Sequence, residues 1–230
     1  MKQILTAVLI LSLLCACSGG TPPSPEAAPP QSQPAASPAL SSESASPPST
    51  PSESEQSEAA PPTGEVVITF DYVKQSGSAS NQFAVWIEDE QGKLIRTLCA
   101  TKFTADGGYS YRPDSIPIWV EKSGLSGMDK SEVDAVTSAT PKPGTLTYAW
   151  NLADDDGNAV AAGRYSFVVE GTLRWKNSVL CRGVIEIGGE PAEAQAEAVF
   201  TFEGADNQPA LSAEAPESAM IGPVTASYKP

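Results

Sequence analysis

The chain has 230 residues, with 14 basic and 28 acidic side chains and a formal net charge of −14. A surface this acidic repels nucleic acids and anionic lipid headgroups, so we expect neither as a partner. The sequence contains no histidine, which excludes Ser-His-Asp and Cys-His catalytic systems and every histidine metal site. We therefore assign no catalytic residue and no metal ligand, and an enzymatic role has no positive support.

The first twenty residues are typical of a lipoprotein leader. An apolar run over 4–14 follows Lys2 and is too short to cross a bilayer as a helix. The block Leu14-Cys15-Ala16-Cys17 resembles the bacterial lipobox. The resemblance implies a signal peptide over 1–16, and two acyl chains at Cys17 that anchor the mature protein to a membrane. An ordinary cleaved signal peptide that leaves free cysteines is the alternative.

Residues 21–63 consist almost entirely of Pro, Ser, Ala, Glu, Gln and Thr, with no aromatic residue. Such a segment cannot bury enough apolar surface to offset its ordering entropy, so we expect it to be disordered and locally extended. We interpret 17–64 as the lipidated Cys17 and a spacer; a glycosylated stalk or a ligand segment is the alternative. Residues 65–230 are then one domain, held outside the cytoplasm at the outer face of the cell membrane, or in the periplasm of a two-membrane envelope.

The domain shows a hydrophobic period of two, which predicts strands. Residues 66–72 form the first strand, and 83–87 and 94–101 form a hairpin around the turn at 88–93. Further strands are expected at 146–152, 165–170, 179–187, 198–202 and 220–228. These elements predict an all-β fold, an Ig-like antiparallel β-sandwich.

The segment from 103 to 143 breaks the strand pattern with glycines and prolines. Asp114 and Ser115 can cap a short helix that begins at Ile116. We expect one long irregular insertion that is only partly ordered, because excursions of this length are usually functional or disordered.

Two resemblances accompany these patterns. The first covers 145–187, where Tyr148, Trp150, Gly157, Gly163 and Tyr165 recur in a pattern similar to the Ig-like domain of flagellar hook-capping proteins. It implies a fold and no flagellar function. The second covers 81–89, 92–98 and 112–119 in order, and resembles a family of predicted periplasmic bacterial proteins without an established function.

The segment 133–140 is similar to the flavinylation signature of extracytoplasmic flavin carriers. Asp134 matches the acidic position, Thr137 and Ser138 the positions before the conserved alanine, and Thr140 the threonine that takes FMN through a phosphoester. The resemblance implies possible covalent FMN, attached by a flavin transferase. The alternative is a capped turn, in which Ser and Thr serve local backbone hydrogen bonding.

Some side chains elsewhere in the chain could serve such a flavin. Aromatic rings can stack on an isoalloxazine and basic groups can meet a phosphate. The candidates are Trp119, Trp150 and Trp175 for the ring, and Arg112, Arg174 and Lys176 for the phosphate.

The domain has two cysteines, Cys99 and Cys181, both in expected strands. Outside the cytoplasm they could form a disulfide; two buried thiols that act as small apolar side chains are an equal alternative. The acidic turn over 154–158 fails the spacing of an EF-hand calcium loop, so we interpret it as a solvated hairpin turn.

The leading hypothesis is a membrane-tethered lipoprotein whose sandwich domain binds an envelope protein or a small ligand without catalysis. The alternative is an extracytoplasmic redox protein that carries FMN at Thr140 or serves a flavin-based electron-transfer system.

Overall fold

The computed structural model describes residues 60–77, 81–204 and 210–230; Cys17 and most of the expected spacer lie outside them. The described residues belong to one compact unit, Gln56–Pro230. The strands are β1 Glu65–Tyr72, β2 Gln82–Glu88, β3 Leu94–Thr101, β4 Thr137–Ser138, β5 Gly144–Trp150, β6 Gly163–Arg174, β7 Asn177–Ile187, β8 Ala192–Gln195, β9 Glu197–Thr201 and β10 Thr225–Lys229. The helices are α1 Lys102–Ala105, α2 Pro117–Ser123 and α3 Lys130–Val136, with 3-10 turns η1 Gly108–Ser110, η2 Leu125–Gly127 and η3 Pro216–Met220.

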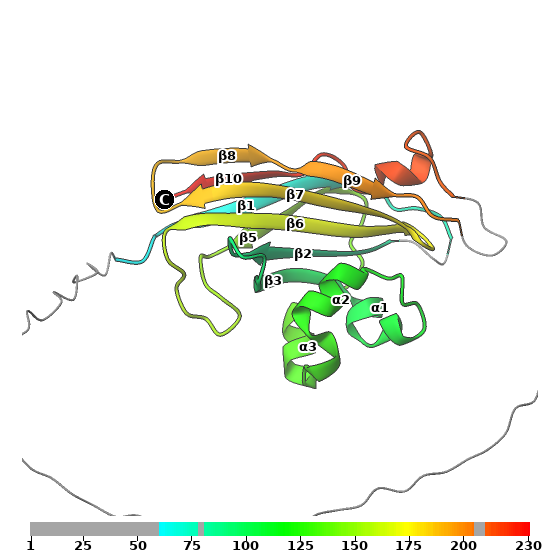
Figure 1. The fold of residues 1–230 in the computed structure, drawn as a ribbon, viewed down its shortest axis with the longest axis horizontal. Helices are drawn as coiled ribbons and strands as arrows, with labels where there is room; N and C mark the ends of the chain where they lie inside the picture. Colours follow the sequence, from blue (N-terminus) through cyan, green and yellow to red (C-terminus); the bar gives the residue numbers. More distant parts are fainter. Residues whose placement is uncertain (1–59, 78–80, 205–209) are drawn as a thin grey trace, which may run out of the picture. The chain divides into compact units, whose positions relative to one another are not determined.

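Two sheets pack face to face (Figure 1). One has the strand order β5-β1-β10-β8, and the other has the order β4-β3-β2-β6-β7-β9. Every pairing is antiparallel except that of β3 with β4. The all-β sandwich expected from the period-two pattern is therefore confirmed.

The main core lies between the two sheets. Phe70, Phe83 and Tyr148 contribute packed aromatic rings, and the Phe70 and Phe83 centroids are 5.8 Å apart in an edge-to-face arrangement. Trp150 packs against Tyr165 at 5.1 Å and donates its ring N–H to the Ala153 carbonyl at 2.8 Å. Burial of these rings contributes much of the apolar driving force for the sandwich.

A second apolar cluster covers the outer face of the six-stranded sheet. Ala84 and Trp86 point to this side of β2, whereas Phe83, Val85 and Ile87 point into the main core. All seven residues of β2 are buried. The helices α1, α2 and α3 lie over this face (Figure 1), which explains why the central strand is buried on both sides.

The segment 103–143 differs from the expected irregular excursion, since it folds into three short helices. The expected short helix exists as α2, but the predicted local cap is wrong. Its N-cap is Ile116, with φ +45°, and no side chain of the cap accepts a hydrogen bond. The N–H groups of Ile118 and Trp119 are instead bound by Glu170 of β6, at 3.2 and 2.8 Å.

Two strands, β4 and β8, were not expected from the sequence. β8 is composed of Ala, Glu, Ala and Gln, residues of low β propensity, and it forms because it pairs with β10. The strand expected at 220–228 starts later than predicted. Met220 is the last residue of η3, and β10 begins at Thr225.

Candidate functional site

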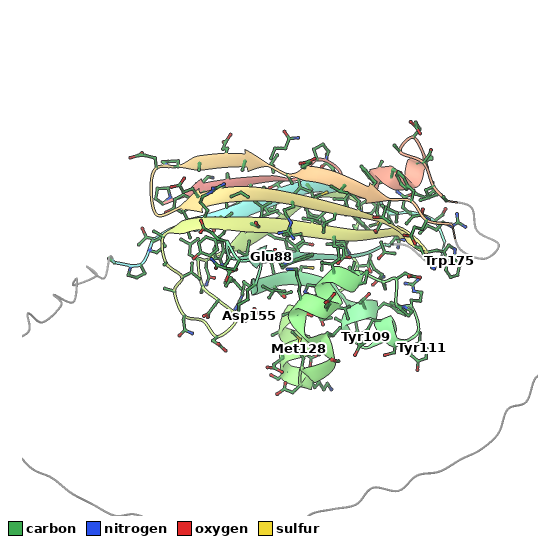
Figure 2. All side chains as sticks on the ribbon, in the orientation of Figure 1. Glu88, Tyr109, Tyr111, Met128, Asp155 and Trp175 are labelled. Carbon is green, nitrogen blue, oxygen red and sulfur yellow. The ribbon has the colours of Figure 1, made fainter. Side chains whose placement is uncertain are left out.

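An open cleft of about 640 Å³ lies between the helical segment and the sheet. Arg96 and Thr97 of β3 line one side together with Asp155 of the acidic turn, and Met128 and Val136 line the helical side. Figure 2 labels Met128 and Asp155 on these two sides. The cleft therefore combines one guanidinium, exposed carboxylates and a partly apolar wall.

The acidic turn closes on itself through Asp154. Its carboxylate accepts the backbone N–H of Asn158 at 2.8 Å, and its own N–H donates to the Asn158 carbonyl at 2.9 Å. Hydrogen bonds from the backbone of Asn158 lower the pKa of Asp154. Gly157 adopts φ +84°, which glycine tolerates without steric cost. Hydrogen bonds within the turn therefore hold its shape, which agrees with the hairpin turn predicted for 154–158.

Asp155 fastens this turn to the edge of β3. Its carboxylate accepts the Thr97 N–H at 3.2 Å, and its N–H donates to the Ile95 carbonyl at 3.0 Å. Arg96 donates to the Asp154 carbonyl at 2.8 Å. β3 is irregular here, with register shifts against β2, and the turn satisfies the backbone groups that the short β4 leaves unpaired. Partial loss of solvent against β3 raises the pKa of Asp155, although its side chain is still 44% exposed.

The opposite wall is held by a capping box at the start of α3. The Asp129 carboxylate accepts the N–H groups of Ser131 and Glu132 at 2.7 and 3.0 Å, and Glu132 accepts the Asp129 N–H at 2.6 Å. This reciprocal arrangement satisfies otherwise unpaired helix N–H groups. The backbone around Met128 is therefore fixed in place.

A buried carboxylate holds α2 against the sheet behind the cleft. Glu88 is fully buried at the end of β2 and accepts the Trp86 ring N–H at 2.7 Å. Arg182 of β7 donates to both of its oxygens, at 2.5 and 3.3 Å, and Lys122 of α2 lies 3.2 Å away. Burial acts to raise the pKa of Glu88, but the hydrogen bonds from Arg182 and Trp86 outweigh it and the pKa is lowered. Glu88 therefore stays ionised and joins three elements.

Residues 63–201 match the family described as "Predicted periplasmic protein (DUF2271)". The match spans more than half of the chain. The chain belongs to this family. The family description places it outside the cytoplasm, as the leader sequence predicted. No curated protein matches the chain, and no solved structure matches it.

The four residues matched to the flavinylation signature, Asp134, Thr137, Ser138 and Thr140, do not line the cleft of this DUF2271 protein, although Ala135 and Val136 of the same segment do. Asp134 is exposed on α3, Thr137 and Ser138 form β4, and Thr140 is exposed on the connection to β5. The Thr137 hydroxyl donates to the Val133 carbonyl at 2.6 Å. This hydrogen bond to the local backbone agrees with the capped turn that was the alternative to flavinylation for this segment. Thr140 is exposed and accessible.

The aromatic partners expected for a flavin are only partly available. Trp119 and Trp150 are both fully buried, so the expectation that they stack on a flavin is wrong. Trp175 is exposed at the tip between β6 and β7. Of the phosphate candidates, Arg174 pairs with Glu217 at 3.6 Å and Arg112 stacks on Phe103.

The disulfide expected as one alternative does not form, and Cys99 and Cys181 are free and buried. Cys99 pairs with Val85, Val85 with Val169, and Val169 with Cys181. The cysteines are therefore three strand spacings apart, about 14 Å, whereas a disulfide needs Cα atoms within about 7 Å. Burial raises the pKa of both thiols.

Two further features follow from the described residues. None of their His, Cys, Asp and Glu side chains gather in groups of three or more that could hold a metal ion. No helix among them is long and apolar enough to span a membrane. Sequence reasoning missed the cleft, Glu88 and Glu170, since only tertiary contacts bring the lining elements together and bury these two carboxylates.

Proposed function

We propose that this DUF2271 protein is a lipoprotein anchored through Cys17, and that its sandwich domain binds a ligand or an envelope partner in the cleft without catalysing a reaction. The observation that carries the proposal is the cleft of about 640 Å³ with both walls held by hydrogen bonds. Preformed concave sites of this size with a few fixed polar groups are the usual form of a ligand site.

The anchor is tested in cells grown with an alkyne analogue of palmitate. Cys17→Ser should abolish labelling and release the protein from the membrane fraction, because both acyl chains depend on this thiol. Cys15→Ser is the matched control and should keep the label. Membrane association that survives Cys17→Ser unchanged would contradict the proposed anchor.

The cleft is tested by thermal shift against a panel of amino acids, amines, sugars and short peptides. A ligand that binds the folded state raises the melting temperature, and the rise grows with the logarithm of ligand concentration above the dissociation constant. Ala135→Trp places a large ring in the cleft and should abolish the shift, whereas Lys130→Trp, on α3 but outside the cleft lining, should retain it. A photo-crosslinking residue at position 131 tests a protein partner at the same wall. Binding that persists in Ala135→Trp excludes the cleft.

The second candidate is an extracytoplasmic flavin protein with FMN on Thr140. The observation that favours it is the exposure of Thr140 on the connection between β4 and β5. With a flavin dinucleotide as donor, the Thr140 oxygen would form a phosphoester with the flavin phosphate. The pyrophosphate bond would break, and a nucleoside monophosphate would leave as the hydroxyl proton passes to solvent. The resemblance to hook-capping proteins supports no role beyond the fold.

Co-expression with a flavin transferase separates the two candidates. A mass increase of one FMN that is lost in Thr140→Ala supports the flavin protein. Thr147→Ala, which removes another exposed threonine, should keep the added mass. An unmodified mass in the presence of an active transferase rejects the flavin candidate and leaves the binding function in place.

A further inference from the structure

Three exposed aromatic side chains gather at one end of the domain, away from the residues that line the cleft. Tyr111 is 87% exposed, Phe103 41% and Trp175 38%. Figure 2 shows Tyr111 and Trp175 at the same end of the sandwich. Exposed aromatic rings that cluster are uncommon on a monomeric surface and indicate a binding site.

A small pocket of about 90 Å³ lies between two of these rings, Tyr111 and Trp175. Tyr111 and Trp175 line it from two segments that lie more than sixty positions apart, and Arg112 and Asp114 contribute one positive and one negative group. The Arg112 guanidinium lies 4.3 Å from the centre of the Phe103 ring, a cation–π contact that fixes its plane. The pocket thus has aromatic walls, balanced charge, and donors as well as acceptors.

Trp175 is held in an unfavourable backbone conformation. It is the first residue of the two-residue turn between Arg174 and Asn177 and has φ +50°. Hairpin turns favour glycine or asparagine at such a position, and a bulky residue there carries strain. Strained backbone conformations cluster at functional sites. A strained residue that exposes an aromatic ring beside a pocket therefore indicates a binding role.

We infer that this end of the domain binds a pyranose ring of a neutral glycan outside the cytoplasm. Aromatic faces accept the C–H face of a sugar, while a guanidinium and a carboxylate pair with its hydroxyl groups, which both donate and accept. The balanced charge of Arg112 and Asp114 suits an uncharged ligand, and the acidic chain, with a net charge of −14, repels polyanionic polymers. The site is independent of the cleft, because the two share no lining residue.

The test uses the secreted full-length chain carrying Cys17→Ser, so that it is handled without lipid. Oligosaccharides of β-1,4-linked N-acetylglucosamine, of β-1,4-linked glucose and of mannose are titrated by calorimetry and by tryptophan fluorescence. At least one of these neutral probes should bind and change the fluorescence of Trp175.

Two variants should weaken binding at least tenfold. Tyr111→Ala removes one aromatic wall. Trp175→Asn removes the other and also relieves the positive φ, so its melting temperature should stay equal or rise. Lost binding in Trp175→Asn therefore cannot come from unfolding. Val184→Ala, an exposed apolar residue of β7 outside the pocket, should bind as the parent does.

Three results would overturn the inference. They are the failure of every neutral oligosaccharide to bind, binding that persists in both variants, and preferential binding of a proline-rich peptide or of a second copy of the chain at the same residues. Cleft binding is measured separately with Ala135→Trp, which should leave glycan binding unchanged.

Discussion

The Glu170 carboxylate on β6 accepts a 2.8 Å hydrogen bond from the backbone N–H of Trp119, at the start of α2. Glu170 is 1% exposed, so the sheet itself caps a helix that lacks a local cap. Thr172, two residues further along β6, accepts the N–H of Ile116 at 2.9 Å. The position of α2, and with it one side of the cleft, depends on these residues of a distant strand.

Stability should fall as pH rises through the titration of Glu170. Burial raises its pKa from 4.5 to about 7, so the folded state binds the proton more tightly than the unfolded state. This contribution, about 3 kcal/mol, is fully present below pH about 4.5 and is lost as pH rises to about 7. Urea unfolding from pH 4.5 to 8 measures it. Glu170→Gln should flatten the pH dependence over this range; an unchanged slope in Glu170→Gln would show that other groups cause it.

Removal of the Glu88 carboxylate should cost about 1–3 kcal/mol of unfolding free energy. Glu88→Ala leaves the buried ring N–H of Trp86 without its acceptor, whereas Arg182 and Lys122 are about a third exposed and can be solvated by water. Urea unfolding of the variant at pH 7 gives the value. Glu186→Ala removes an exposed carboxylate from β7 and should change stability by less than about 0.5 kcal/mol. Similar costs for both variants would mean that the buried cluster contributes little.

Gly183→Ala should destabilise the sandwich by about 1–3 kcal/mol. A Cβ atom at this position would lie 2.1 Å from the Phe167 ring, which packs directly over the glycine on the neighbouring strand. The change in melting temperature reports the cost. At Gly189 a Cβ atom would meet nothing within 4 Å, so Gly189→Ala should be close to neutral. A neutral Gly183→Ala would show that Phe167 has another place to pack.

Both domain cysteines should resist alkylation while the protein is folded. Burial raises the pKa of the Cys181 thiol to about 11 and also raises that of Cys99, so neither forms a reactive thiolate near neutral pH. Mass spectrometry after iodoacetamide treatment should find both unmodified in buffer and both modified in urea. An oxidant should produce no link between them, because they lie on strands three spacings apart. A native mass two units lower would contradict the strand register that separates the two cysteines.

Some strands and helix caps of this fold can be predicted from the sequence alone, and others cannot. Alternation in 66–72 and 83–87 predicted two central strands, because a half-buried strand requires apolar residues on every second position. β8 could not be predicted, since Ala and Glu favour no strand outside the pairing with β10. The capping box at Asp129 and Glu132 is a local pattern and could have been read from the sequence.

The candidate sites depend more strongly on tertiary contacts. Sequence composition and local motifs determined the class of the protein, its expected export, its sandwich fold and the exposed segment around Thr140, because periodicity and leader patterns act over short stretches of chain. Only the folded structure decided that Cys99 and Cys181 stay apart, that Trp119 and Trp150 are buried, and that Asp155 binds the edge of β3. The physical reason is that sheet register and packing join residues 50 to 100 positions apart, and no local pattern encodes such distances.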